Sequence, residues 1–182
     1  MIARRFATPD RFVFLDESGA KTNMTRHYGR APVGERCNFF NAHGHWRTTT
    51  MISAIRRGEV VVEATQLIDG PMNAATFLAY VEACLAPALR PGEIVVMDNL
   101  GSHKVAGVVE AIERAGASVW WLPPYSPDLN PIEKLWSKIK SWLRRAAADT
   151  LAGLARAAGE AFRDVTPLEC ANYFTATGYT DK

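Results

Sequence analysis

The apolar residues of this chain fall into short blocks that are separated by polar turns, and the blocks differ in their spacing. Compact runs of aromatic and β-branched residues are typical of strands, whereas apolar residues that recur every third or fourth position are typical of helices. Runs of the first kind predict strands at residues 11–15, 48–55, 59–67, 93–97 and 118–122. Helical spacing predicts helices at about 73–85, 104–115, from about 130 onward, and 150–165. This order of elements indicates an α/β domain with a mixed sheet.

The segments between these blocks indicate how the elements connect. A turn at Arg56–Gly58 joins the second and third predicted strands, so we expect them to form a hairpin. The run 93–97 is almost wholly apolar, as in a central strand that is buried on both faces. Pro167 is expected to end the last helix, and a short tail follows it. We therefore expect one domain over residues 1–182, with a C-terminal helical extension from about residue 146.

Composition is that of an ordinary globular protein. The chain has 182 residues, of which 48% are hydrophobic, and this is enough to bury a core. No stretch approaches the roughly 18 consecutive apolar residues that cross a bilayer, and no signal peptide is visible, so we expect a cytoplasmic protein with no membrane partner. Three widely spaced cysteines argue against a disulfide framework and against a structural zinc site.

Basic residues are more informative by their distribution than by their sum. The formal net charge is only +2, but basic side chains gather in two segments, 26–36 and 134–145, while the acidic residues lie largely elsewhere. Local basic surfaces of this kind can bind phosphate even on a nearly neutral chain. The candidates for contacts with a DNA backbone are Arg26, Arg30, Arg36, Lys104, Lys140 and Arg144.

Three acidic residues stand out by their positions. Asp16 follows the first predicted strand, Asp98 follows the fourth, and Glu133 lies near the start of a long helix. If the two strands are neighbours, their terminal side chains can converge, and a few carboxylates suffice for Mg²⁺, which keeps several of its waters. Two such ions can stabilise the attacking and the leaving oxygen of a phosphoryl displacement, which needs no nucleophile from the protein. The chain also lacks the motifs of nucleophilic serine hydrolases, P-loop proteins and zinc proteases.

Each acid also has an ordinary structural interpretation. An aspartate after a strand is often only a turn former. Asn130, Pro131 and Glu133 form the pattern of a helix start with a capping box, in which Glu133 would bond to the backbone. Further along this helix, Lys140 and Arg144 share a strip with Glu133, and this strip suits either a DNA backbone or a solvated salt-bridging face.

Four segments resemble bacterial insertion-sequence transposases of the mariner superfamily, which are DDE-type transposases. They are LDES (Leu15–Ser18), HGHWRTTT (His43–Thr50), VVMDNLGSHK (Val95–Lys104) and LPPYSPDLNPIEKLWSKIK (Leu122–Lys140). The last two are long and specific, and 34 residues separate Asp98 from Glu133, the interval that this superfamily favours. The resemblance covers roughly residues 11 to 175.

The resemblance implies an RNase H-like fold, in which a mixed sheet is flanked by helices. It implies that Asp16 bridges two Mg²⁺ or Mn²⁺ ions, that Asp98 binds one of them and that Glu133 binds the other. The implied reactions are hydrolysis of DNA at the transposon ends and attack of the freed 3′-hydroxyl on target DNA. Asn99 and His103 match polar positions of the second motif and are expected near the site as helpers rather than ligands. Asp128 lies between prolines and fits a turn better than the third acid.

Full-length members of this superfamily carry an N-terminal helix-turn-helix region, whereas only about ten residues precede the first predicted strand here. We therefore expect recognition of the transposon ends to come from a helix-turn-helix polypeptide supplied separately, and a homo-oligomer to assemble on double-stranded DNA in the bacterial cytoplasm, at the nucleoid. Two alternatives stay open from the sequence: an RNase H-like nuclease without strand transfer, and an inactive DNA-binding relic.

Overall fold

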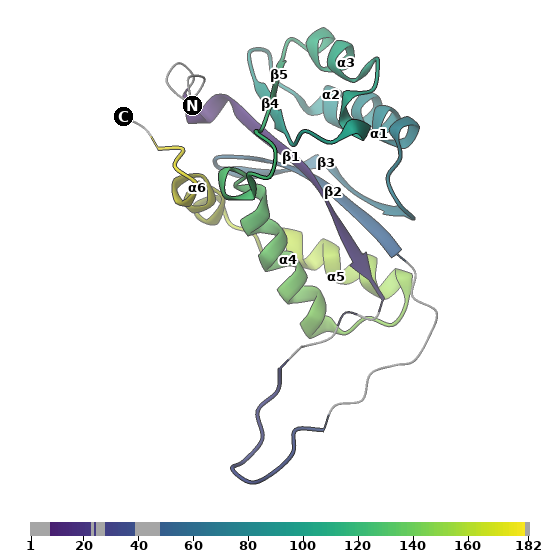
Figure 1. The fold of residues 1–182 in the computed structure, drawn as a ribbon, viewed down its shortest axis with the longest axis vertical. Coiled ribbons are helices and arrows are strands. Elements are labelled where there is room, and N and C mark those ends of the chain that lie inside the picture. Colours follow the sequence, from purple (N-terminus) through teal and green to yellow (C-terminus); the bar gives the residue numbers. More distant parts are fainter. Residues whose placement is uncertain (1–7, 23, 25–27, 39–47, 181–182) are drawn as a thin grey trace.

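A five-stranded mixed sheet forms the centre of the computed structural model, which describes residues 8–22, 24, 28–38 and 48–180. Its strands are β1 (Phe12–Lys21), β2 (Thr48–Arg56), β3 (Glu59–Asp69), β4 (Ile94–Met97) and β5 (Ser118–Trp121), in the spatial order β3-β2-β1-β4-β5. β1 pairs antiparallel with β2 and parallel with β4, so it lies at the centre of the sheet (Figure 1). The expected hairpin is β2–β3, which is antiparallel.

Helices cover both faces of this sheet (Figure 1). On one side lie α1 (Ala74–Tyr80), the π-helical turn η3 (Val81–Leu85), α2 (Ala86–Ala88) and α3 (Val108–Arg114). On the other side lie α4 (Ile132–Ala146), α5 (Leu151–Arg163) and α6 (Pro167–Ala176). Short 3₁₀ turns precede β1 (η2, Pro9–Arg11), α3 (η4, Gly101–Lys104) and α4 (η5, Pro127–Leu129). The expected mixed sheet flanked by helices is thus confirmed.

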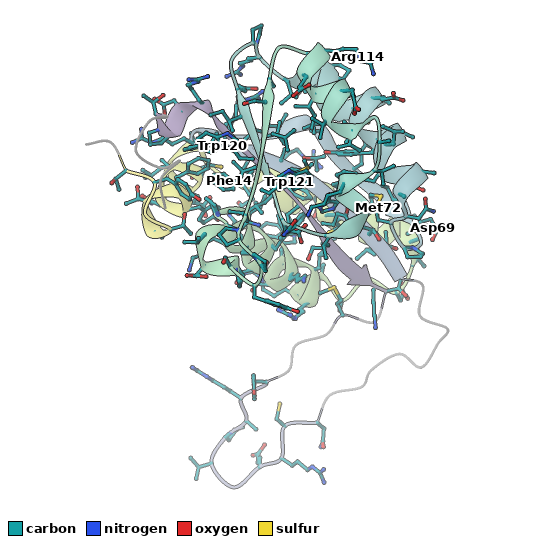
Figure 2. All side chains as sticks on the ribbon, turned by 45° about the horizontal axis from the view of Figure 1, so that its top comes forward. Phe14, Asp69, Met72, Arg114, Trp120 and Trp121 are labelled. Atoms are coloured by element: carbon teal, nitrogen blue, oxygen red, sulfur yellow. The ribbon has the colours of Figure 1, made fainter. Side chains whose placement is uncertain are left out.

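β1 contributes side chains to the hydrophobic core on each face of the sheet, because successive side chains of a strand point to opposite faces. Phe12 and Phe14 pack with α4, α5 and α6, whereas Val13 and Leu15 pack with α1, η3 and α3. Figure 2 shows side chains filling the space between the sheet and the helices on each side. The buried residues of α4 are those that its helical spacing predicts, namely Ile132, Leu135, Trp136, Ile139 and Leu143.

β1 is longer than the sequence predicts. A strand ending at Asp16 is wrong, because β1 continues to Lys21 and pairs with β2 along this whole stretch, from Asp16 opposite Ser53 to Lys21 opposite Thr48. The continuation is polar, and its strand conformation comes from the backbone ladder with β2 rather than from an apolar run. Asp16 therefore lies in the middle of a strand.

Two helix boundaries also differ from expectation. α3 begins at Val108 instead of near residue 104, because Gly107 at its N-cap has a φ of 98° that interrupts the helix. Pro167 does not end the helical region. It begins α6, where Thr166 and Glu169 form a capping box, and proline is favoured in the first helical turn. Instead of a tail, the chain therefore forms a third helix whose Phe174 lies in the same core as Phe14.

The segment that follows residue 146 packs closely against the rest of the structure. Leu154 and Ala158 of α5 and Phe174 of α6 belong to the core that α4 shares with β1. Among the described helices, none has the length and apolar character needed to cross a membrane.

Candidate active site

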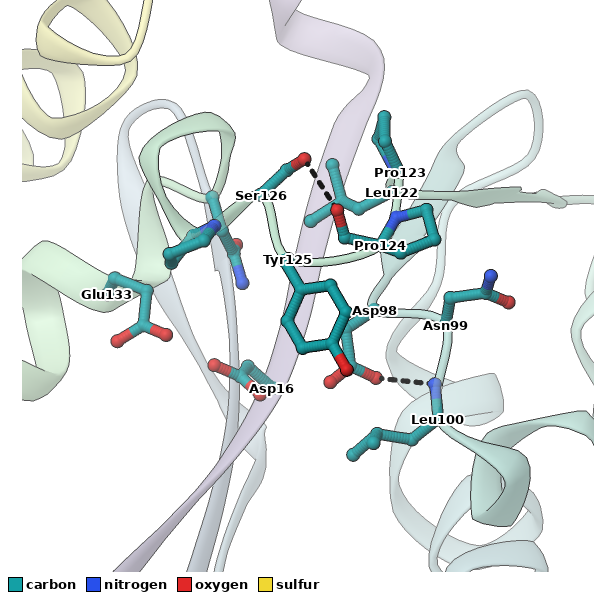
Figure 3. A pocket seen from close by; sticks show the side chains of 12 residues that line it. Asp16, Asp98, Asn99, Leu100, Leu122, Pro123, Pro124, Tyr125, Ser126 and Glu133 are labelled. Carbon is teal, nitrogen blue, oxygen red and sulfur yellow. Dashed lines mark hydrogen bonds between the residues drawn. The ribbon is translucent and has the colours of Figure 1, made fainter.

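A cavity of about 400 Å³ opens where β1, β4 and α4 meet, and the three predicted acids line it (Figure 3). Asp16 comes from the middle of β1, Asp98 follows the last residue of β4, and Glu133 lies in the first turn of α4. The parallel register between β1 and β4 places Phe14 opposite Val96, so Asp16 and Asp98 come level two residues further on. The structure therefore brings together three residues that are far apart in the sequence.

Glu133 does not act as a helix cap in this structure. α4 has Pro131 at its N-cap, and no side chain caps the helix there. The alternative interpretation of Glu133 as half of a capping box with Asn130 is therefore wrong. In Figure 3 the Glu133 carboxylate extends from α4 on the same side of the cavity as Asp16.

Asn130 is a site residue that the sequence did not indicate. It lines the cavity, its side chain is buried, and its Oδ1 has no hydrogen-bond partner within the described part of the chain. From the sequence, an asparagine before Pro131 is interpreted as an N-cap, and only the tertiary structure places it in the same cavity lining as Asp16 and Glu133. A buried carbonyl oxygen without a donor is costly and points to a ligand or water at this position.

Asp16 lies in an environment that disfavours its negative charge. Burial raises the pKa of Asp16 to about 7, and the Glu133 and Asp98 carboxylates raise it too, although the Glu17 N–H, 2.7 Å from its Oδ1, acts in the opposite direction. The twelve described residues that line the cavity include no lysine or arginine. A cation bound between these acids would therefore offset both the cost of burying the Asp16 charge and the repulsion among the three carboxylates.

One oxygen of Asp98 has two polar neighbours, a hydrogen-bonding backbone N–H and the Nδ1 of His103, whose close approach is an ion-pair contact without hydrogen-bond geometry. Its Oδ1 accepts from the N–H of Leu100 at 3.2 Å and lies 2.7 Å from Nδ1 of His103. Burial acts to raise the pKa of Asp98, but these contacts with His103 and Leu100 lower it overall. For His103, burial acts to lower the pKa, and the contacts with Asp98 and Glu17 raise it to about 9. His103 thus contacts Asp98 behind the cavity, whereas the exposed Asn99 lines the cavity.

The outer rim of the cavity is the proline-rich segment Leu122–Pro127. Tyr125 in this segment is fully exposed and has a φ of 53°, a left-handed conformation that is uncommon for residues other than glycine. In Figure 3 its ring lies over the space between Asp98 and Glu133. The sequence shows only that prolines surround this tyrosine, and its position at the rim was not predicted. Asp128, which lies in η5, is exposed and does not line the cavity.

The predicted basic residues are spread over several elements. Lys140 and Arg144 are partly buried on α4, the helix that carries Glu133, and Lys104 lies 5.7 Å from the centre of the Trp121 ring. Arg30 and Arg36 are exposed in the segment 28–38. Arg26 lies outside the described residues, as does most of the segment His43–Thr50.

A family model for the DDE superfamily endonuclease matches residues 11–154, which is most of the chain. The chain belongs to this family. The matched part of this DDE endonuclease includes all three acids, and the resemblance that the sequence motifs carry is confirmed at the level of the family.

The solved structures that are similar to this DDE endonuclease include structures of Mos1 transposase. The Mos1 transposase paired-end complex with left transposon end has a TM-score of 0.78 and 18% identity, covering 97% of this chain and 55% of that one. The catalytic domain of Mos1 mariner transposase has a TM-score of 0.72 and 18% identity, covering 97% of this chain and 81% of that one. A structure of the Mos1 transposase catalytic domain and raltegravir with Mg has a TM-score of 0.72 and 19% identity. The RNase H-like fold is thereby confirmed.

This chain therefore spans little more than half the length of the Mos1 transposase in the paired-end complex, and most of its catalytic domain. No curated protein sequence matches the chain.

Proposed function

We propose that this domain cuts DNA phosphodiester bonds at the ends of a transposable element and joins the freed 3′-hydroxyl to target DNA. The observation that carries this proposal is the convergence of Asp16, Asp98 and Glu133 on one cavity without a cationic side chain in its lining. The family supports endonuclease chemistry, and the similar solved structures include a Mos1 transposase complex with a transposon end.

The three acids would hold two divalent cations, Mg²⁺ or Mn²⁺. Asp16 would be shared by the two ions, as the resemblance of the sequence motifs implies, although no three histidine, cysteine, aspartate or glutamate side chains of the described residues form a ready-made site for one ion. Asp98 would then complete one ion and Glu133 the other, with water filling the remaining positions. Two metal ions in such a site stabilise the attacking and leaving oxygens of an in-line displacement.

The residues of the chain would act by holding and orienting the reacting groups. In the first step a water oxygen attacks phosphorus, and the 3′ oxygen of the cut strand leaves as a hydroxyl. In the second step this hydroxyl attacks a target phosphate, and a target 3′-hydroxyl leaves. Both steps exchange one P–O bond for another, so one set of carboxylates can serve both.

The basic residues on α4 and near the rim would hold the DNA backbone. Lys140 and Arg144 follow Glu133 along α4, while Lys104 lies in η4, beyond the cavity residue Leu100. We propose that Arg26, Arg30 and Arg36 also contact the DNA backbone, since the segment that contains them is basic. We also propose that a separately supplied helix-turn-helix polypeptide recognises the transposon ends, and that the active form is a homo-oligomer on DNA.

Cleavage of DNA that carries the inverted repeats flanking the gene tests the proposal, with the helix-turn-helix region supplied and Mg²⁺ or Mn²⁺ present. We expect Asp16→Asn, Asp98→Asn and Glu133→Gln each to lower the cleavage rate by about a thousandfold or more, because each removes a metal ligand. Asp128→Asn is the matched control and should cleave normally. The assignment is wrong if all three variants cleave like the parent, and its third acid is wrong if Asp128→Asn loses activity while Glu133→Gln does not.

Pre-cut ends separate strand transfer from simple hydrolysis. We expect an end with a free 3′-hydroxyl to be joined to a target plasmid in a metal-dependent reaction. If the domain nicks intact ends but never joins pre-cut ones, it is a nuclease without strand transfer. If it binds DNA and does neither, it is an inactive relic.

A further inference from the structure

His103 is held on three sides behind the proposed metal site. Its side chain is 1% exposed, its Nδ1 lies 2.7 Å from Asp98 Oδ1, and its Nε2 lies 3.0 Å from Glu17 Oε1. The ring of Phe77 stacks against its face, with 4.4 Å between the ring centroids and an interplanar angle of 27°. Both edges and one face of this imidazole are therefore in contact with other side chains.

Glu17 reaches His103 from the face of β1 that is opposite to Asp16. Consecutive residues of a strand point to opposite faces, so Asp16 faces the cavity and Glu17 faces the layer that contains Phe77. The backbone of Glu17 is paired with Ile52 in β2, which fixes where its side chain starts. Glu17, which does not line the cavity, is thus linked to Asp98 through the ring of His103.

The two neighbours of Asp98 Oδ1 decide which oxygen Asp98 presents to the cavity. Oδ1 accepts from Leu100 N–H and faces His103, so these groups occupy it. Figure 3 shows the other carboxylate oxygen turned toward Asp16. Neighbours of a metal ligand that fix its orientation in this way are known to matter for affinity, and their loss typically costs about 10- to 100-fold.

We propose that Glu17 is a positioning residue for Asp98, acting through His103. Glu17 keeps the imidazole in place, and the imidazole keeps Oδ1 of Asp98 occupied so that the other oxygen faces the metal. This inference rests on the proposed function, since it needs Asp98 to be a metal ligand. It differs from a purely structural role of the Glu17–His103 pair, which would support folding without affecting metal binding.

Calorimetric titration of the whole 182-residue chain with Mn²⁺ tests the inference without an activity assay. We expect Glu17→Ala to weaken Mn²⁺ binding by about 10- to 100-fold. Glu17→Gln should recover most of the affinity, because its side-chain amide can still hydrogen-bond to the ring. Glu63→Gln, at an exposed carboxylate on β3, is the matched control and should bind like the parent. Thermal unfolding of each variant establishes that it is folded under the titration conditions.

A double-mutant cycle identifies the route of the effect. If Glu17 acts through His103, then Glu17→Ala should cause no further loss of Mn²⁺ affinity in a His103→Ala background. An equal loss in both backgrounds means that Glu17 does not act through the ring, and the inference is wrong. It is also wrong if Glu17→Ala lowers the unfolding temperature but leaves Mn²⁺ affinity unchanged.

Asp98→Asn separates this inference from the function on which it rests. If Asp98→Asn weakens Mn²⁺ binding and Glu17→Ala does not, only the role of Glu17 is refuted. If the parent binds no Mn²⁺, or Asp98→Asn binds it as tightly as the parent, the proposed metal site and the role of Glu17 are refuted together.

Discussion

Asp16 and Glu17 are neighbours in β1, yet they serve opposite faces of the sheet. Asp16 lines the cavity with Glu133, while Glu17 contacts His103 on the side of α1 and α3. Two consecutive acids in the middle of a strand therefore have separate environments. One of them lines the cavity, and the other contacts a buried histidine.

Neutralising Asp16 should stabilise the protein in the absence of metal. Burial raises the pKa of Asp16 from 3.8 to about 7, so its contribution to folding is most favourable below pH 3.8 and is lost as the pH rises through about 7. At pH 8, Asp16→Asn keeps the acceptor for Glu17 N–H and removes the charge. We expect its free energy of unfolding to rise by an amount on the order of 2 kcal/mol in urea with a chelator present.

Mg²⁺ should reverse this difference between the parent and Asp16→Asn. A ligand that binds only the folded state raises the melting temperature, so Mg²⁺ should stabilise the parent and leave Asp16→Asn unchanged. If Asp16→Asn is less stable than the parent in the chelator, then the buried charge of Asp16 does not destabilise the metal-free protein, and the prediction is wrong.

Lys138 of α4 forms an ion pair with Glu169 of α6. Lys138 Nζ lies 2.8 Å from Glu169 and 2.9 Å from Asp164, and the Lys138 ammonium and the Thr166 N–H lower the pKa of Glu169 below its ordinary 4.5. A lowered folded-state pKa means that this contribution is present above pH 4.5 and is lost as the pH falls through the folded value. Glu169→Gln should therefore cost about 1 kcal/mol at pH 7, and the difference should shrink below pH 4. Denaturant unfolding at pH 7 and pH 3.5 measures it, with Glu160→Gln on α5 as the control.

Tyr125 should matter for DNA binding rather than for folding. Tyr125→Gly removes an exposed ring and relieves a left-handed backbone, while it adds freedom to the unfolded chain, so we expect stability to change by less than about 1 kcal/mol. An exposed aromatic ring at the rim can stack on an unpaired base, and its loss should weaken binding of a DNA end with a single-stranded overhang by about tenfold. Tyr125→Phe keeps the ring and should bind like the parent in a fluorescence anisotropy titration. Equal binding by Tyr125→Gly would show that the ring does not contact DNA.

The basic residues on α4 should set part of the salt dependence of DNA binding. Lys140→Gln and Arg144→Gln should each reduce the slope of log affinity against log salt by about 1, because each removes one phosphate contact. Arg114, which lies at the outer surface of α3 beside Glu82 (Figure 2), is the control. If Arg114→Gln changes the slope as much as the α4 variants do, the DNA does not follow α4.

Periodicity predicted those parts of the fold that one segment encodes by itself. The core face of α4 and the strand that ends before Asp98 could both be predicted, since each is an apolar pattern within a single element. The polar second half of β1 could not, because it is a strand only through its pairing with β2. Pro167 was misinterpreted for a related reason: a proline can follow one helix or begin the next, and the capping box of Thr166 and Glu169 decides between them.

The candidate site was predicted through its motifs rather than through spacing alone. Asp16, Asp98 and Glu133 each had an ordinary explanation, and the specific segments around them linked them. Asn130 and Glu17 were missed because their roles depend on contacts across the fold, with the cavity in one case and with His103 in the other.

The pairing of Asp16 with Ser53 in the central strand has a mechanical consequence. Moving the backbone of Asp16 would break hydrogen bonds of the β1–β2 ladder, whereas Glu133 is carried by a helix that is held to the sheet by side-chain packing. Sliding of packed helices requires smaller rearrangements than shifting a strand within its sheet. In the two phosphoryl transfers that we propose, Asp16 would thus be the fixed ligand, and α4 would be the element that can adjust the distance of Glu133 from it.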